Sequence, residues 1–179
     1  MNRPDPGAPP KLRRAAPADF PQVLALNEES VRYLSPMDAD RLQALHGQAW
    51  LHLVVEAQGA VQAFLLAFRE GASYDSPNYR WFAARYPRFA YIDRVVVAPA
   101  ARGGGCGRRL YDAVFEAAAR AGVGTVVCEF DVEPPNEASR LFHAHFGFVE
   151  VGRQEVRGKQ VSLQAAHVAD RLPRPGPQP

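Results

Sequence analysis

A glycine-rich segment at residues 95–110, VVVAPAARGGGCGRRL, has the residue types and spacing of an anion-binding site. Four glycines within five positions separate a run of three valines and Pro99 from a stretch with the apolar spacing of a helix. Glycine lets the backbone approach a ligand closely. The first N–H groups of a helix have no partner within it, and with the helix dipole they favour an anion, usually phosphate. A mobile turn between strand and helix is the alternative interpretation.

The order of residues in this segment excludes two common phosphate-binding loops. A Walker loop requires Lys and Ser or Thr after its last glycine, and neither follows Gly107. A dinucleotide loop requires G-x-G-x-x-G, and the last position of that pattern is Arg108 or Leu110 here. The pattern that fits is R-x-x-G-x-G, formed by Arg102, Gly105 and Gly107.

A second motif follows at the distance of one helix and one strand. It reads N-x-x-[AS] at Asn136–Ser139 and continues through an aromatic stretch to Gly147 and Phe148. With the R-x-x-G-x-G loop, it makes the sequence resemble the GNAT superfamily of N-acetyltransferases over about residues 11–165. The segment YDSPNYRWF at 74–82 is similar to a poorly characterised bacterial branch of that superfamily.

The resemblance implies that acetyl-CoA is the co-substrate and lies where two neighbouring strands separate. It also implies that a backbone N–H near Val97 stabilises the developing oxyanion. The residues implied to bind acetyl-CoA through its pantetheine arm, its pyrophosphate or the second motif are Val95, Val96, Val97, Arg102, Gly103, Gly104, Gly105, Cys106, Gly107, Arg108, Asn136 and Ser139.

The group that protonates the leaving thiolate is His143 in our prediction. Members of the superfamily often have a tyrosine seven residues after the signature asparagine, and this chain has His143 there. An imidazolium can donate a proton near neutral pH. The alternative is that His143 packs beside Phe142 and Phe146 and has a structural role, in which case Tyr74 or Tyr79 could supply the proton.

Three carboxylates are candidates for the base that deprotonates the acceptor ammonium. Asp93 lies on the strand before the glycine loop, and Glu129 and Asp131 lie on the next strand. Side-chain alternation decides which of them face the cleft, but a bulge of one residue reverses the answer. Each of them alternatively has a structural role, and a water relay without an essential base is a further possibility.

A long aromatic connection at residues 70–89 is predicted to bind the acceptor, because long loops beside a site often bind substrate. The residues we assign to the acceptor are Tyr74, Asp75, Tyr79 and Trp81. The alternative is that this connection covers a sheet edge or forms a dimer contact.

These residues require a scaffold of alternating strands and helices. Hydrophobic periodicity predicts strands at 11–15, 50–57, 59–69, 90–98 and 125–132, and a final hairpin at 148–168. It predicts one helix that begins at 17–19 and three further helices at 38–47, 105–122 and 136–147. We therefore expect an α/β fold with a GNAT-like mixed, mainly antiparallel sheet and helices on both faces. Residues 11–168 form the domain, and the proline-rich ends, 1–10 and 169–179, are predicted to be disordered.

Composition limits the class of protein. The chain has 179 residues, of which 47% are hydrophobic and 22% charged, a net charge of +2, and two cysteines. This predicts one cytoplasmic domain with no disulfide framework, no metal site, and neither nucleic acid nor membrane as a partner. The partner is an amine acceptor, either a small molecule or a protein, and the protein is a monomer or homodimer. We predict an acetyl-CoA-dependent N-acetyltransferase that acts on a primary amine by direct attack on the thioester. The alternative is a non-catalytic acyl-CoA-binding sensor.

Overall fold

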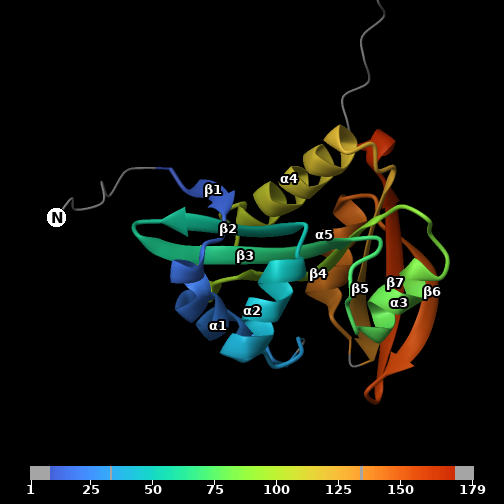
Figure 1. Cartoon of the computed structure of the whole chain (residues 1–179), viewed down its shortest axis with the longest axis horizontal. Coiled ribbons are helices and arrows are strands. Elements are labelled where there is room, and N and C mark those ends of the chain that lie inside the picture. The colour runs from blue at the N-terminus through green and yellow to red at the C-terminus, as the bar shows by residue number, and fades with distance from the viewer. Residues whose placement is uncertain (1–8, 33, 134, 172–179) are drawn as a thin grey trace, which may run out of the picture.

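The computed structural model describes residues 9–32, 34–133 and 135–171 (Figure 1). Most of the two predicted disordered ends, residues 1–8 and 172–179, lies outside the described residues. The described residues continue past position 168, the predicted end of the domain, to position 171. Residues Val168–Asp170 form a 3₁₀ turn, and the Arg171 guanidinium lies 4.3 Å from the ring centre of Phe146.

One sheet of seven strands organises the domain. The strands are β1 (Lys11–Arg14), β2 (Leu51–Ala57), β3 (Ala60–Arg69), β4 (Ala90–Val97), β5 (Thr125–Glu133), β6 (Val149–Val156) and β7 (Lys159–His167). Their order is β1-β2-β3-β4-β5-β7-β6. Only β4 and β5 are parallel neighbours, and every other neighbouring pair is antiparallel. The prediction of a mixed, mainly antiparallel sheet is confirmed.

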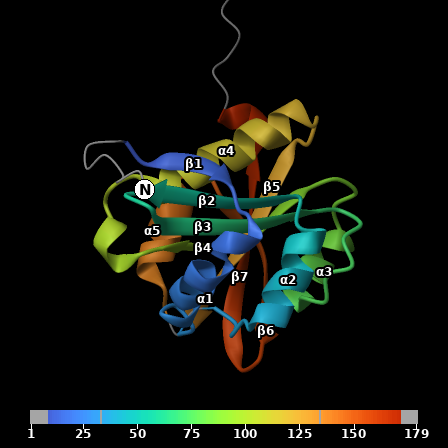
Figure 2. The same ribbon diagram turned by 60° about the vertical axis from the view of Figure 1, so that its left-hand side comes forward.

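Helices cover both faces of this sheet, as Figure 2 shows. The helices are α1 (Phe20–Glu28), α2 (Ala39–Gln48), α3 (Pro77–Ala83), α4 (Cys106–Arg120) and α5 (Glu137–His145). Apolar side chains of α1, α2 and α3 pack in one hydrophobic cluster, and those of α4 pack in another with Phe146 at the end of α5. The two clusters lie on opposite sides of the sheet because successive strand residues point to opposite faces.

Helix α3 is the one difference from the predicted order of helices and strands. It lies inside the connection at 70–89, for which the sequence predicts a long loop. Its seven residues are too few to show a helical period, but its local signals are present. Ser76 caps its first turn by accepting a hydrogen bond from the Tyr79 N–H, and Pro77 occupies the first helical position.

Strands β4 and β5 pair over only two residues. Ala90 and Tyr91 lie opposite Val126 and Val127, and no pairing follows in this described part of the sheet. The register of β4 against β3 shifts at this point, because Ile92 and Arg94 oppose consecutive β3 residues and Asp93 is extra. A bulge of this kind bends the strand. Beyond Tyr91 the two strands therefore separate.

Within the described residues, no helix has the length and apolar character needed to cross a membrane. The same residues contain no group of three or more His, Cys, Asp or Glu side chains arranged to hold a metal ion.

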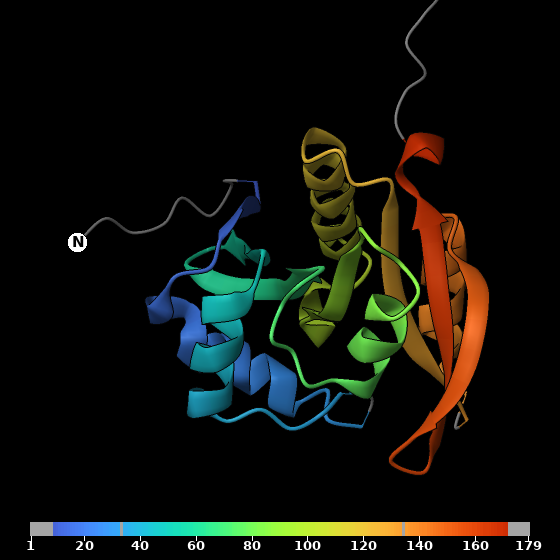
Figure 3. The same cartoon turned by 45° about the vertical axis from the view of Figure 1, so that its right-hand side comes forward.

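Helix α3 is held against β6 by a close contact between Trp81 and Gly152. A Cβ atom on residue 152 would lie 2.5 Å from Cζ2 of the Trp81 indole. Figure 3 shows α3 beside the β6–β7 hairpin. A side chain at position 152 is therefore incompatible with the observed place of the helix.

We predict that Gly152→Ala lowers the free energy of unfolding by about 1–3 kcal/mol, because the added methyl group must displace a packed indole. Urea denaturation measures the effect. Gly47→Ala is the control, since a Cβ at that helical position meets open space and is expected to stabilise the protein by about 0.5–1 kcal/mol. Equal stabilities of the two variants would contradict the proposed packing constraint.

Candidate functional site

A cleft of about 1340 Å³ lies where β4 and β5 separate. Its walls come from the α1–α2 connection, the start of α3, both strands, the starts of α4 and α5, and the β6–β7 hairpin. Most of the residues predicted for the site line this single cleft. They include the valines of β4, Arg102, Gly107, Asn136, Ser139, His143 and all three candidate carboxylates.

The glycine loop forms the N-terminal end of α4. Gly105 is the N-cap residue and has a φ of 79°, in the left-handed region that favours glycine. Gly107 lies against α5, where an added Cβ would be 3.3 Å from the ring of Phe142. The N–H groups of the first turn, Cys106 to Arg108, have no acceptor within the helix. The loop therefore has the geometry of an anion cradle.

Side chains around this loop divide into two groups. Arg102 lines the cleft. Arg108 contacts His145 at 2.6 Å outside the cleft lining, and Arg109 donates to the Pro10 carbonyl at 2.5 Å. The Cys106 side chain is buried in the core, so only its backbone faces the loop.

The second motif begins α5. The Asn136 side chain caps this helix by accepting a hydrogen bond from the Ser139 N–H at 3.2 Å, and both residues line the cleft. The motif therefore places the start of α5 opposite the glycine loop.

His143 is buried on the α4–α5 side of the cleft. Its Nδ1 lies 2.7 Å from the Ser139 carbonyl oxygen, which can only accept, so Nδ1 carries the hydrogen. Nε2 is then the acceptor for the Tyr111 hydroxyl at 2.8 Å. Burial lowers the pKa of His143 to about 4, against the smaller opposite effect of the Ser139 carbonyl. The imidazole is therefore neutral near pH 7 and has no free proton to donate into the cleft.

Tyr111, which is not among the predicted site residues, lines the cleft from α4. Burial raises the pKa of this phenol well above its usual value. Its position among apolar residues of α4 is typical of a core side chain, so the sequence gives no signal of its contact with His143.

Two of the three candidate carboxylates are ion-paired. Asp93 accepts hydrogen bonds from Arg94 at 2.7 Å and from the Tyr74 hydroxyl at 2.5 Å. Asp131 lies 2.8 Å from the Lys159 ammonium. Each of these two carboxylates therefore lies against the cation of a neighbouring side chain.

Glu129 differs because its hydrogen-bond donors are neutral. Its Oε1 accepts from the Tyr91 hydroxyl at 2.9 Å and from the Asn78 amide at 2.8 Å. Its Oε2 is buried and has no hydrogen-bond partner among the described residues. Burial, and next the charge of Asp93, raise the pKa of Glu129 to about 8. The structure thus brings to the cleft one carboxylate that can accept a proton near neutral pH.

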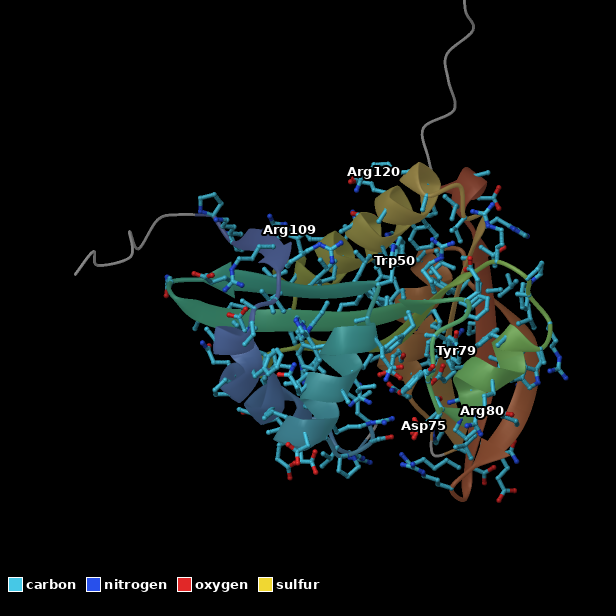
Figure 4. All side chains as sticks on the ribbon, in the orientation of Figure 1. Trp50, Asp75, Tyr79, Arg80, Arg109 and Arg120 are labelled. Carbon is cyan, nitrogen blue, oxygen red and sulfur yellow. The ribbon has the colours of Figure 1, made fainter. Side chains whose placement is uncertain are left out.

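The predicted acceptor residues are divided by the structure. Tyr74 and Asp75 line the cleft, and Asp75 pairs with Arg41 of α2 at 2.5 Å. Figure 4 shows Asp75 between α2 and α3. Tyr79 and Trp81 do not line it: the Tyr79 hydroxyl donates to the Arg69 carbonyl in the core, and Trp81 packs on Gly152. These two aromatic residues hold α3 in place, so we do not carry them into the proposed acceptor site.

Comparisons with known proteins agree with this geometry. The model of the acetyltransferase (GNAT) family matches residues 15–148. No curated protein sequence matches the chain. Among solved structures, YncA of Salmonella typhimurium, determined with acetyl-CoA, is 20% identical, covers 96% of this chain and 99% of its own, and has a TM-score of 0.68.

Two further structures have the same fold. Ard1 of Thermoplasma volcanium is 18% identical, with coverage of 88% of this chain and 97% of its own and a TM-score of 0.71. The ribosomal-protein-alanine N-acetyltransferase of Brucella melitensis is 24% identical, with coverage of 88% and 99% and a TM-score of 0.66.

The neutral, buried state of His143 predicts a loss of stability in acid. The unfolded chain binds a proton at this histidine below about pH 6.5, whereas the folded protein binds it only near pH 4. The free energy of unfolding therefore rises with pH between these values. The His143→Gln variant keeps an acceptor for Tyr111. We predict that, between pH 7 and pH 4.5, its free energy of unfolding falls by about 2 kcal/mol less than that of the parent. Urea denaturation at both pH values tests this, and equal losses would refute it.

Proposed function

Since this chain belongs to the GNAT acetyltransferase family, we propose that it transfers the acetyl group of acetyl-CoA to a primary amine, with Glu129 as the base. The observation that carries the proposal is the state of Glu129 in the cleft. It is a carboxylate with a pKa near 8, neutral donors on one oxygen and no partner on the other. Such a group can hold a proton taken from an ammonium at neutral pH.

The residues of the glycine loop fit acetyl-CoA. The left-handed cap at Gly105 and the small residue at position 107 leave the first-turn N–H groups of α4 open to phosphate oxygens. Arg102 adds a cation on the cleft side. When bound, acetyl-CoA supplies the acetyl group as a thioester.

Strand β4 supports the proposal through its backbone. Alternate N–H and C=O groups of a strand point to opposite neighbours, and β5 pairs with none of β4 beyond Tyr91. We propose that these groups, from Ile92 to Val97, hold the pantetheine arm. We also propose that an N–H near Val97 donates to the carbonyl oxygen as negative charge develops on it.

The proposed chemistry is a direct transfer. Glu129 accepts one proton from the acceptor ammonium, either directly or through one water, and the freed nitrogen attacks the thioester carbon. The new C–N bond forms, the C–S bond breaks, and a second proton of the nitrogen leaves on the sulfur. Glu129 then releases its proton to solvent. No acid is assigned to His143, because its buried ring is neutral and already donates to Ser139.

The acceptor is proposed to enter between the α1–α2 connection and α3, beside Tyr74 and Asp75. The amine belongs to a small molecule or to a protein. A screen should therefore include small amines and a peptide with N-terminal alanine, the residue named for the Brucella melitensis neighbour.

Calorimetric titration with acetyl-CoA tests the loop. We predict that Gly105→Glu weakens binding by about tenfold or more, since it adds strain and a negative charge at the helix N-terminus. Gly122→Glu is a matched control, because Gly122 also has a positive φ but lies at the other end of α4. Equal losses in both variants, or no binding by the folded parent, would overturn the assignment of the loop.

Release of free CoA with the amine panel tests the base. We predict that kcat/KM of the parent rises with pH up to about 8 and then levels off, because Glu129 must be deprotonated. Glu129→Gln is expected to lower kcat/KM about 10²–10³-fold and to abolish this rise. Glu155→Gln makes the same change on an exposed side chain and should have no effect. Binding of acetyl-CoA without turnover of any amine would favour a sensor instead.

A further inference from the structure

We infer that Asn78 of α3, oriented by Gln154 of β6, is a positioning residue for the Glu129 carboxylate in the acetyl transfer. The inference rests on the proposed function, in which Glu129 is the base. It gives a role to α3, a helix without a predicted counterpart, and to two side chains outside the two GNAT motifs.

A chain of hydrogen bonds links the three side chains. The Gln154 Nε2 donates to the Asn78 Oδ1 at 2.5 Å, and the Asn78 Nδ2 donates to the Glu129 Oε1 at 2.8 Å. Because Gln154 donates to the oxygen of the Asn78 amide, the NH₂ group of Asn78 faces Glu129. The opposite orientation would place the amide oxygen against a carboxylate oxygen, which is repulsive.

The contact between α3 and β6 keeps these hydrogen-bonded side chains aligned. Gly152 and Gln154 are two residues apart on β6, so both face the same side of the strand. Asn78 and Trp81 are three residues apart on α3 and share one face of the helix. Trp81 packs on Gly152 while Asn78 meets Gln154, so two parallel contacts fix the helix on the strand.

Other groups around Glu129 set its charge balance. From β4, the Tyr91 hydroxyl donates to it, Asp93 repels its charged form and Arg94 attracts it. The Glu129 charge also raises the pKa values of Tyr74, Tyr111 and Cys128, which belong to the 70–89 connection, α4 and β5.

Asn78 and Tyr91 are the direct donors that favour the carboxylate over the neutral acid. Removing the Asn78 donor takes away one of the three interactions that favour the carboxylate against burial and the Asp93 charge, and leaves Tyr91 and Arg94. The carboxyl group then keeps its proton to higher pH.

The test is a direct titration of Glu129 in the full chain. Carboxyl groups are labelled with ¹³C-glutamate, and Glu129→Gln identifies the signal that belongs to residue 129. We expect Asn78→Leu to raise the pKa of Glu129 from about 8 by one to two units, the usual effect of a lost hydrogen bond to a charged group. Ala83→Leu, which places the same side chain at an exposed site on α3, should leave it unchanged.

Gln154→Leu provides a second variant that does not alter the group touching Glu129. It removes the donor that orients Asn78, and we expect a smaller rise of the Glu129 pKa in the same direction. An unchanged pKa in whichever of these two variants folds would overturn the inference, regardless of whether Glu129 is the base.

The pH dependence of kcat separates positioning from a purely structural role. With the amine that the parent acetylates fastest, Asn78→Leu should lower kcat about 10–100-fold at pH 7 and much less at pH 10, with acetyl-CoA affinity unchanged. A loose α3 would instead lower kcat equally at all pH values, and that result would count against the inference. If the carboxyl pKa moves but the rate profile does not, the contact stands and Glu129 is not the base.

Discussion

The bulge at Asp93 is the constraint on which the rest of the site depends. It ends the pairing of β4 with β5 after two residues, and the two strands then separate. Among the described residues, separation leaves the β4 backbone groups that point towards β5 without a strand partner, and it opens the cleft between two halves of one sheet. The extra residue also lets Asp93 and Arg94 face the same side, where they form a buried ion pair. A strand that paired along its whole length would leave no room for either substrate.

The acidic side chains of the cleft differ in the charge of their partners. A buried charge is costly unless it is paired and hydrogen-bonded. Asp93 and Asp131 each have a cationic partner. Glu129 receives hydrogen bonds only from the neutral side chains of Asn78 and Tyr91. Burial therefore raises its pKa to about 8. Three residues that look equivalent in the sequence thus acquire different chemistry from their partners.

The two sides of the sheet have different tasks in this arrangement. The side of α4 and α5 holds the glycine loop, the capped start of α5 and the neutral His143–Tyr111 pair. The side of α1, α2 and α3 holds the carboxylates and the proposed acceptor entrance. The cleft between the strands connects them, and in the proposed function a thioester held from one side meets an amine that enters from the other.

The sequence by itself determined the strands, four of the five helices and the glycine loop, because these depend on local patterns of glycine and apolar residues. It also named Asp93, Glu129 and Asp131 as candidates for the base, beside a water relay without an essential base. It did not separate these three, because their partners lie on distant segments: Asn78 is 51 residues from Glu129, and Lys159 is 28 from Asp131. The neutrality of His143 likewise follows from burial. Only the tertiary structure fixes burial and long-range partners, and these set the pKa values on which the chemistry depends.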